Sequence, residues 1–158
     1  MEQTGHRMDL SPITETSYLT AQNVRQYRAI MRLFFREYEK MRFQLYKEDV
    51  LELLRRQEEF ADYTMAQLAQ DLDALVGWKN LTPIQDPRKV YTIADYKNKQ
   101  YRYTMSEYAV EIERLTARLE NLFLESGNLS TNLFKRLADN LEEAELVDRQ
   151  KGKEINEW

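Results

Sequence analysis

Three features of the 158-residue sequence predict a mainly α-helical fold that carries a small β wing. Only 4 Gly and 3 Pro residues occur, whereas Leu, Glu, Gln and Arg, which favour helices, are abundant. Apolar residues recur at spacings of three and four along most of the chain. Residues 64–105 contain a short helical pattern, a Gly-Trp turn and two strand-like segments, in that order. This order indicates a winged helix-turn-helix domain followed by a helical extension.

The sequence divides into four parts. Residues 1–19 are polar, show no sustained period and are expected to form a flexible N-terminal lead-in. Residues 20–106 are expected to form the winged-helix domain, and residues 107–147 the helical extension. Residues 148–158 form a polar tail whose terminal Trp158 has no evident local partner, which suggests truncation of a longer chain.

The first helix is expected to start at Asn23, because Asn23 and Gln26 have the spacing of a capping box. Apolar residues cover an unusually large part of its circumference, and such a helix is buried on more than one side. Two interpretations stay open. The helix is the centre of the domain core, or Phe34, Phe35 and Tyr38 also contact a partner or a second copy.

A short strand and two helices are expected next. Residues 43–46 alternate briefly between apolar and polar, which is typical of a strand, and residues 47–57 follow helical spacing. Thr64 and Gln67 have the pattern of a capping box at the start of the third helix. Gly77 is expected to end that helix in the left-handed conformation.

The third helix distinguishes two functions of a winged-helix domain. In a DNA-reading domain this helix enters the major groove, and many of its hydrogen bonds go to phosphate. Here its solvent face is expected to present Gln67, Gln70, Asp71 and Asp73. The helix itself contains no Lys or Arg, and the first cation, Lys79, follows its end. Because carboxylates repel phosphates, this helix is expected to contact protein.

Trp78 follows the third helix directly and has two interpretations. Aromatic residues at such positions anchor protein interfaces, so Trp78 is a candidate interface residue. It is equally well explained as a core residue beneath the wing.

The wing is the one basic part of the sequence. Residues 86–103 contain five cations and two carboxylates, which gives a net charge of +3. Interleaved tyrosines make the segment a candidate for weak, salt-sensitive and sequence-independent contact with a DNA backbone. Alternatively, an exposed hairpin carries Lys and Arg for solubility and edge protection. The candidate DNA-contacting residues are Arg88, Lys89, Lys97, Lys99 and Arg102.

The helical extension is expected to be an antiparallel helix pair. Ser106 caps its first helix, whose apolar residues form a heptad-like seam that includes Leu115, Leu119 and Leu122. These three leucines are candidate protein contacts. Gly127-Asn128 is expected to break this helix, and a second amphipathic helix follows.

Composition argues against an enzyme. The sequence contains no Cys and a single histidine, His6, so neither thiolate chemistry nor a multi-histidine metal site can be assembled from this chain alone. No Gly-rich phosphate loop occurs. We expect no catalytic residues, no metal site and no cofactor. With a net charge of −4, no signal-peptide core and no membrane-spanning run, a soluble cytoplasmic protein is expected.

One pattern and several shorter runs of this sequence carry a family resemblance. The most specific is the L-x-x-L-x-x-W-x-N-L pattern from Leu72 to Leu81. The other runs are residues 27–35, 63–68, 92–96, 102–103 and 111–114. Together they resemble the N-terminal domain of the JetA family of bacterial Wadjet plasmid-defence clusters, over about residues 20–125.

The resemblance implies a kleisin-like subunit, similar in role to MukF, encoded beside an SMC-like ATPase and a topoprim nuclease. Its winged helix would dimerise, and its following helices would contact the neck of an SMC coiled coil, together with a MukE-like accessory subunit. ATP and metal chemistry would reside in partner chains only. The expected function is therefore a non-enzymatic assembly and dimerisation module of an SMC-like plasmid-defence complex of the condensin/MukBEF type.

Two rival functions stay open. A winged-helix transcription regulator would read an operator, but it needs cations on the third helix that this sequence lacks. An accessory folding module of an unrelated enzyme is the other.

Overall fold

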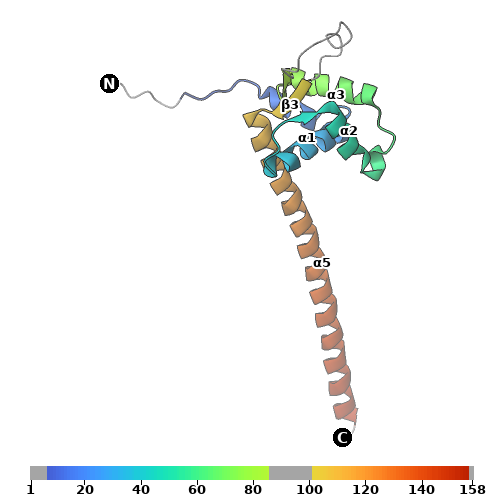
Figure 1. The fold of residues 1–158 in the computed structure, drawn as a ribbon. Helices are drawn as coiled ribbons and strands as arrows, with labels where there is room; N and C mark the ends of the chain where they lie inside the picture. The colour runs from blue at the N-terminus through green and yellow to red at the C-terminus, as the bar shows by residue number, and fades with distance from the viewer. Residues whose placement is uncertain (1–6, 86–100, 157–158) are drawn as a thin grey trace. The chain divides into compact units, whose positions relative to one another are not determined.

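The computed structural model describes residues 7–85 and 101–156, which form a mainly helical protein with a small antiparallel sheet (Figure 1). The chain divides into two units, Met1–Leu115 and Thr116–Trp158. Helix α5 (Glu107–Asn156) starts in the first unit and provides the described residues of the second. The other elements are η1 (Thr14–Leu19), α1 (Val24–Glu39), β1 (Leu45–Tyr46), α2 (Lys47–Arg55), η2 (Glu58–Phe60), α3 (Met65–Gly77), β2 (Leu81–Gln85) and β3 (Tyr101–Met105).

The three strands form one antiparallel sheet in the order β1-β3-β2. Strand β3 pairs with β2 from Leu81 opposite Met105 to Gln85 opposite Tyr101. It pairs with β1 through Leu45 opposite Tyr103. Strand β3 lies at the end of the region predicted to contain the wing, residues 64–105, and β1 lies within the strand expected at residues 43–46, so both of these strands are confirmed.

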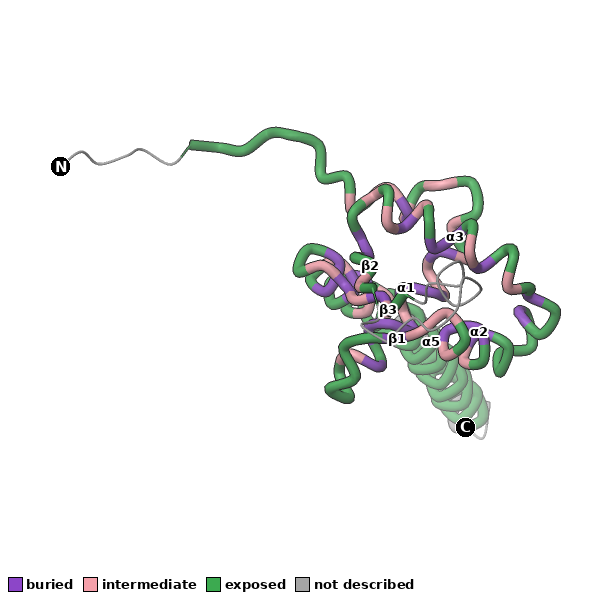
Figure 2. Tube along the Cα trace, turned by 45° about the horizontal axis from the view of Figure 1, so that its top comes forward, coloured by how far each residue is buried: buried purple, intermediate pink, exposed green. Residues whose placement is uncertain are grey.

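The core of the first unit lies between α1, α2, α3 and the sheet. Figure 2 shows buried residues on all three helices. Burying each large apolar side chain is worth about 1.5–3 kcal/mol relative to leaving it exposed. The fully buried residues include Ile30, Met31, Leu45, Val50, Leu54, Leu68, Leu72 and Leu75.

Two of the three predicted N-terminal caps are confirmed. The Thr64 hydroxyl accepts a hydrogen bond from the Gln67 N–H (3.2 Å), and the Gln67 side chain accepts one from the Thr64 N–H (2.9 Å). The Ser106 hydroxyl accepts one from the Ala109 N–H at 3.2 Å. Asn23 precedes α1, but its side chain makes no capping hydrogen bond, so the predicted capping box there is wrong.

Two residues after its last residue, each of the helices α1 and α3 is followed by a non-glycine residue in the left-handed region. Met41 follows α1 with a φ of 66°, and Lys79 follows α3 with a φ of 65°. After α3, the Asn80 N–H donates to the Leu75 carbonyl at 2.9 Å, which is the long hydrogen bond of a Schellman motif. Gly77 lies inside α3 without a positive φ, so its predicted role is wrong.

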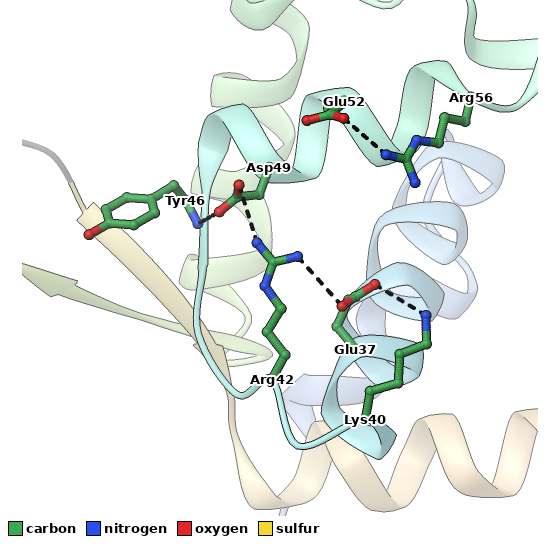
Figure 3. Close-up of polar contacts among 7 residues, drawn as sticks. All are labelled: Glu37, Lys40, Arg42, Tyr46, Asp49, Glu52 and Arg56. Carbon is green, nitrogen blue, oxygen red and sulfur yellow. Dashed lines mark hydrogen bonds and ion pairs between the residues drawn. The ribbon is translucent and has the colours of Figure 1, made fainter.

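Arg42 connects the end of α1 to the start of α2 (Figure 3). Its guanidinium lies 3.6 Å from a Glu37 carboxylate oxygen and 3.2 Å from an Asp49 carboxylate oxygen. Asp49 in turn accepts a hydrogen bond from the Tyr46 N–H at 3.0 Å. These contacts fix the short connection that contains β1, and thereby the edge of the sheet.

Part of the predicted lead-in belongs to the first unit. Residues 14–19 form η1, and Tyr18 is fully buried. The Asn80 side-chain amide donates a hydrogen bond to the Glu15 carbonyl at 2.7 Å. The prediction of a flexible lead-in is therefore wrong for residues 14–19, while residues 1–6 lie outside the described residues.

The predicted antiparallel pair at residues 107–147 is wrong, because α5 runs without interruption through Gly127 to Asn156 (Figure 1). One glycine in a helix interior costs about 0.5–1 kcal/mol relative to Ala, and no proline follows Pro87. The predicted tail from residue 148 is accordingly helical up to Asn156. The first unit extends past the predicted boundary at residue 106, since Ala109 and Val110 are buried in its core.

Candidate protein-interaction surface

Side chains of the first unit line an open hollow of about 450 Å³. It contains the exposed Arg25–Glu59 ion pair, whose closest atoms are 2.6 Å apart. Across residues 7–85 and 101–156, no cluster of His, Cys, Asp and Glu side chains could hold a metal ion. In the same residues, no helix is both long and apolar enough to cross a membrane. The surfaces of the helices are therefore the better candidates for a functional site.

The candidate contacts on α1 are mostly core residues. Phe34 and Phe35 are 2% and 5% exposed. Tyr38 is half-buried, and its ring meets that of Phe43 edge-to-face at a centroid distance of 5.1 Å. Because their own unit covers them, Phe34 and Phe35 have no surface left for a partner, and the prediction that they contact one is wrong. The alternative interpretation, a central core helix, describes α1.

The exposed face of α3 differs from its prediction at one position. Gln67, Gln70 and Asp73 are exposed, as predicted. Asp71 is only 6% exposed and accepts a hydrogen bond from the Tyr63 hydroxyl. Burial raises the pKa of the Asp71 carboxyl above its usual value. The surface of α3 therefore carries one carboxylate fewer than predicted, but still no cation.

Trp78 lies at the rim of the core. Its ring packs edge-to-face on Tyr27, with a centroid distance of 5.0 Å and an interplanar angle of 80°. It is partly buried against the core cluster. Only the remaining part of the ring is open to a partner, which favours the core interpretation.

Most candidate DNA-contacting residues lie outside the described residues, namely Arg88, Lys89, Lys97 and Lys99. Arg102 is half-buried on β3, the central strand, where it lies opposite Ile84 of β2 and Tyr46 of β1. Its position is therefore within the sheet.

A buried polar cluster that the sequence did not reveal holds η1 and the start of α5 in the first unit. The Glu113 carboxylate is 1% exposed and accepts hydrogen bonds from the Tyr18 hydroxyl and, at 2.9 Å, from the Arg32 guanidinium. Burial and then the nearby Glu113 charge raise the pKa of Tyr18. Tyr18 and Glu113 are 95 positions apart. The sequence around each of them is rich in polar or charged residues, which is typical of a solvent-exposed segment. No local pattern signals their contact.

Helix α5 carries an extended exposed apolar surface within the second unit. We call it the α5 stripe, and its side chains are between 48% and 78% exposed. Steps of three, four and eleven residues connect its main positions, and such steps return an α-helix to nearly the same side. Leu119 and Leu122 belong to it, and Leu115 of the first unit is exposed as well. The stripe comprises Leu119, Leu122, Phe123, Leu133, Phe134, Leu137, Leu141 and Val147.

No curated protein and no solved structure shows a significant match to this chain. A family model described as "Protein of unknown function (DUF2397)" matches residues 16–158. The matched span includes every described element except the first two residues of η1. The chain therefore belongs to the DUF2397 family.

Proposed function

We propose that the first unit is a winged helix and that the protein is a kleisin-like assembly and dimerisation module of a bacterial SMC-like plasmid-defence complex. The order α1, β1, α2, α3, β2, β3 supports the winged helix, because the β2-β3 hairpin follows the third helix and β1 adds to its far strand. The proposed partners are a second copy, the coiled-coil neck of an SMC-like ATPase and a MukE-like accessory subunit.

The single observation that carries this proposal is the α5 stripe. Exposed contiguous apolar surface on a soluble protein marks a contact with another molecule. A helix with one apolar side is stable in water when another element covers that side. The described residues of the second unit all lie on α5, so no other described element of that unit covers the stripe. An assembly subunit needs such a surface.

The surface of α3 supports a protein-binding role over an operator-reading one. Its exposed polar residues are Gln67, Gln70 and Asp73, and its sequence from Met65 to Gly77 contains no Lys or Arg. A recognition helix normally supplies cations and amides to phosphates and bases. We propose that any DNA contact by the wing is weak and independent of sequence.

A host assay tests the assembly function. Deleting the gene should raise plasmid transformation efficiency as much as deleting a neighbouring SMC-like ATPase gene, and purified chain should bind that ATPase. The proposal fails if no such gene lies nearby, or if the purified proteins do not associate.

A fluorescence-polarisation titration with duplex DNA tests the alternative. The module should bind only weakly, and added salt should abolish binding. Nanomolar, sequence-specific binding at physiological salt would instead identify a regulator.

A further inference from the structure

We propose that α5 of a second copy covers the α5 stripe, with the two helices antiparallel and in one defined register. This deepens the dimerisation part of the proposed function and rests on it to that extent. The evidence is the order of charges beside the stripe in the second-unit part of α5, residues 116–156.

Four exposed charged residues form one edge of the stripe, which we call the charged flank. They are Arg118, Glu125, Arg136 and Glu143. Successive members are seven, eleven and seven positions apart, and each step returns the helix to within about 20° of the same side. The opposite edge of the stripe is lined by Phe123, Phe134 and Leu141, and the carboxylates of Glu120 and Glu145 lie beside them, so this edge carries no cation.

The signs along the charged flank alternate, so that reversing the helix matches each charge with its opposite. Glu125 and Arg136 share a midpoint between residues 130 and 131, and Arg118 and Glu143 share the same midpoint. A two-fold axis at this point brings Glu125 beside Arg136 and Arg118 beside Glu143 in a single register. Each pair then forms twice, as an isologous interface requires.

The two edges of the stripe also determine the direction of the second helix. In a parallel pair, each edge faces the other edge of its partner, so the charged flank would face Phe123, Phe134 and Leu141. In an antiparallel pair, like edges face each other, so the alternating charges of the charged flank meet their opposites, and Phe123, Phe134 and Leu141 face their own copies. Charges that flank an apolar seam set partner choice and orientation in this way. The observed edges therefore favour the antiparallel pair.

The length of the stripe is sufficient for a dimer. About 30 residues of overlap around the midpoint correspond to roughly 45 Å of helix. Covering this length on both copies buries on the order of 1,000 Å², near the lower limit of specific interfaces. A dimer that forms at micromolar concentration is expected.

Sedimentation velocity of charge-reversal variants of the 158-residue chain tests the register. Glu125→Arg and Arg136→Glu should each raise the dimer dissociation constant about tenfold or more at low salt. In either variant, residues 125 and 136 of the two copies carry the same charge, and the symmetry places this repulsive pair in the interface twice. The double variant restores both pairs and should return the wild-type value. Glu142→Arg, on the side of α5 away from the stripe, is the matched control and should change nothing. If each single variant weakens the dimer but the double variant does not restore its dissociation constant, the proposed register is wrong.

Cross-linking tests the direction of the helices, because the chain contains no native cysteine. Leu122 and Leu133 are exposed members of the stripe, eleven positions apart and therefore on the same side of α5. In the proposed dimer, residue 133 lies about 8 Å along the axis from the level of its copy, and residue 122 about 26 Å. A short bis-maleimide should therefore link Leu133→Cys to itself and leave Leu122→Cys unlinked. Equal linking of both would indicate parallel helices and overturn the proposal.

The dimer and the proposed function fail separately. A chain that stays monomeric at about 100 micromolar overturns the dimer, on the scale at which interfaces of ordinary size associate. If that monomer binds the SMC-like ATPase through α5, the assembly part of the proposed function stands and only its dimerisation part is lost. An antiparallel dimer that binds no such ATPase supports this inference and removes the plasmid-defence role.

Discussion

Helix α1 and the second-unit part of α5 both carry rows of apolar residues, but the surroundings of the two rows differ. Seven residues of α1 are buried, because α2, α3, η1 and the sheet pack around it. On α5 beyond Leu115, the large apolar side chains that the structure describes are about half exposed or more. The periodicity of a helix thus shows which side is apolar, but not whether the same chain covers that side. Where it does not, the apolar row is evidence for a partner.

The largest expected contrast comes from the same substitution in each region. Leu72→Ala removes a fully buried side chain from the first unit and should lower its free energy of unfolding by about 2–5 kcal/mol. Leu133→Ala removes an exposed side chain from α5 and should leave the unfolding of the first unit unchanged. Chemical denaturation followed by Trp78 fluorescence measures both, in a Trp158→Phe background that leaves Trp78 as the sole tryptophan. Equal losses in the two variants would show that α5 is buried in the same core.

The buried Tyr18–Glu113 contact gives the next largest effect. Tyr18→Phe keeps the ring but removes a hydrogen-bond donor to the buried Glu113 carboxylate. At neutral pH this should cost about 1–3 kcal/mol of the first unit's stability. Tyr108→Phe, at an exposed position of α5, is the matched control and should have little effect. A neutral Tyr18→Phe substitution would mean that η1 does not stabilise the first unit.

The same contact predicts a dependence on alkaline pH. Burial, and then the Glu113 charge, raise the pKa of Tyr18 in the folded protein. The pKa of a tyrosine in the unfolded chain is about 10. A raised pKa contributes stability that is complete below the unfolded pKa and declines as the pH rises above it. Between about pH 9 and 11, wild-type protein and Tyr108→Phe should therefore lose more stability than Tyr18→Phe.

Removing a helix cap should cost less stability. Thr64 and Asn23 begin the same kind of sequence pattern, but the structure predicts different costs for replacing them. Thr64→Ala removes a capping hydrogen bond that the structure contains and should cost about 1 kcal/mol. Asn23→Ala removes a side chain in the same kind of pattern but without a capping hydrogen bond, so it should cost little. Urea denaturation measures both. A larger loss for Asn23→Ala would mean that Asn23 caps α1 in solution.

What the sequence predicted correctly was local. The starts of α3 and α5 follow from Thr64 and Ser106, whose hydroxyls bond to backbone groups three residues ahead. Strand β3 follows from its composition and from the alternation of Tyr101, Tyr103 and Met105.

What the sequence did not predict depends on contacts between distant residues. The burial of Phe34 and Phe35 depends on how many elements surround α1. The Tyr18–Glu113 contact joins segments 95 positions apart. At Gly127, the helical tendency of flanking residues outweighed a local break signal. For the candidate surface, the sequence named Leu119 and Leu122 correctly as apolar positions on one side of a helix, but it placed them inside an antiparallel pair.

Gly127→Ala gives the smallest effect and tests whether α5 is a single helix. A Cβ at Gly127 meets no atom within 4 Å, and no glycine in the described residues has a positive φ. Alanine should therefore stabilise α5 locally by about 0.5–1 kcal/mol, because glycine loses more backbone entropy in a helix. Hydrogen exchange of peptides spanning residues 120–135 should become slower, and Gly152→Ala should have less effect because it lies in the fraying last turns. If Gly127 instead formed a turn between two helices, alanine would strain that turn and speed exchange. The sign of the change thus separates one continuous helix, whose stripe stays open to a partner, from two helices that cover each other.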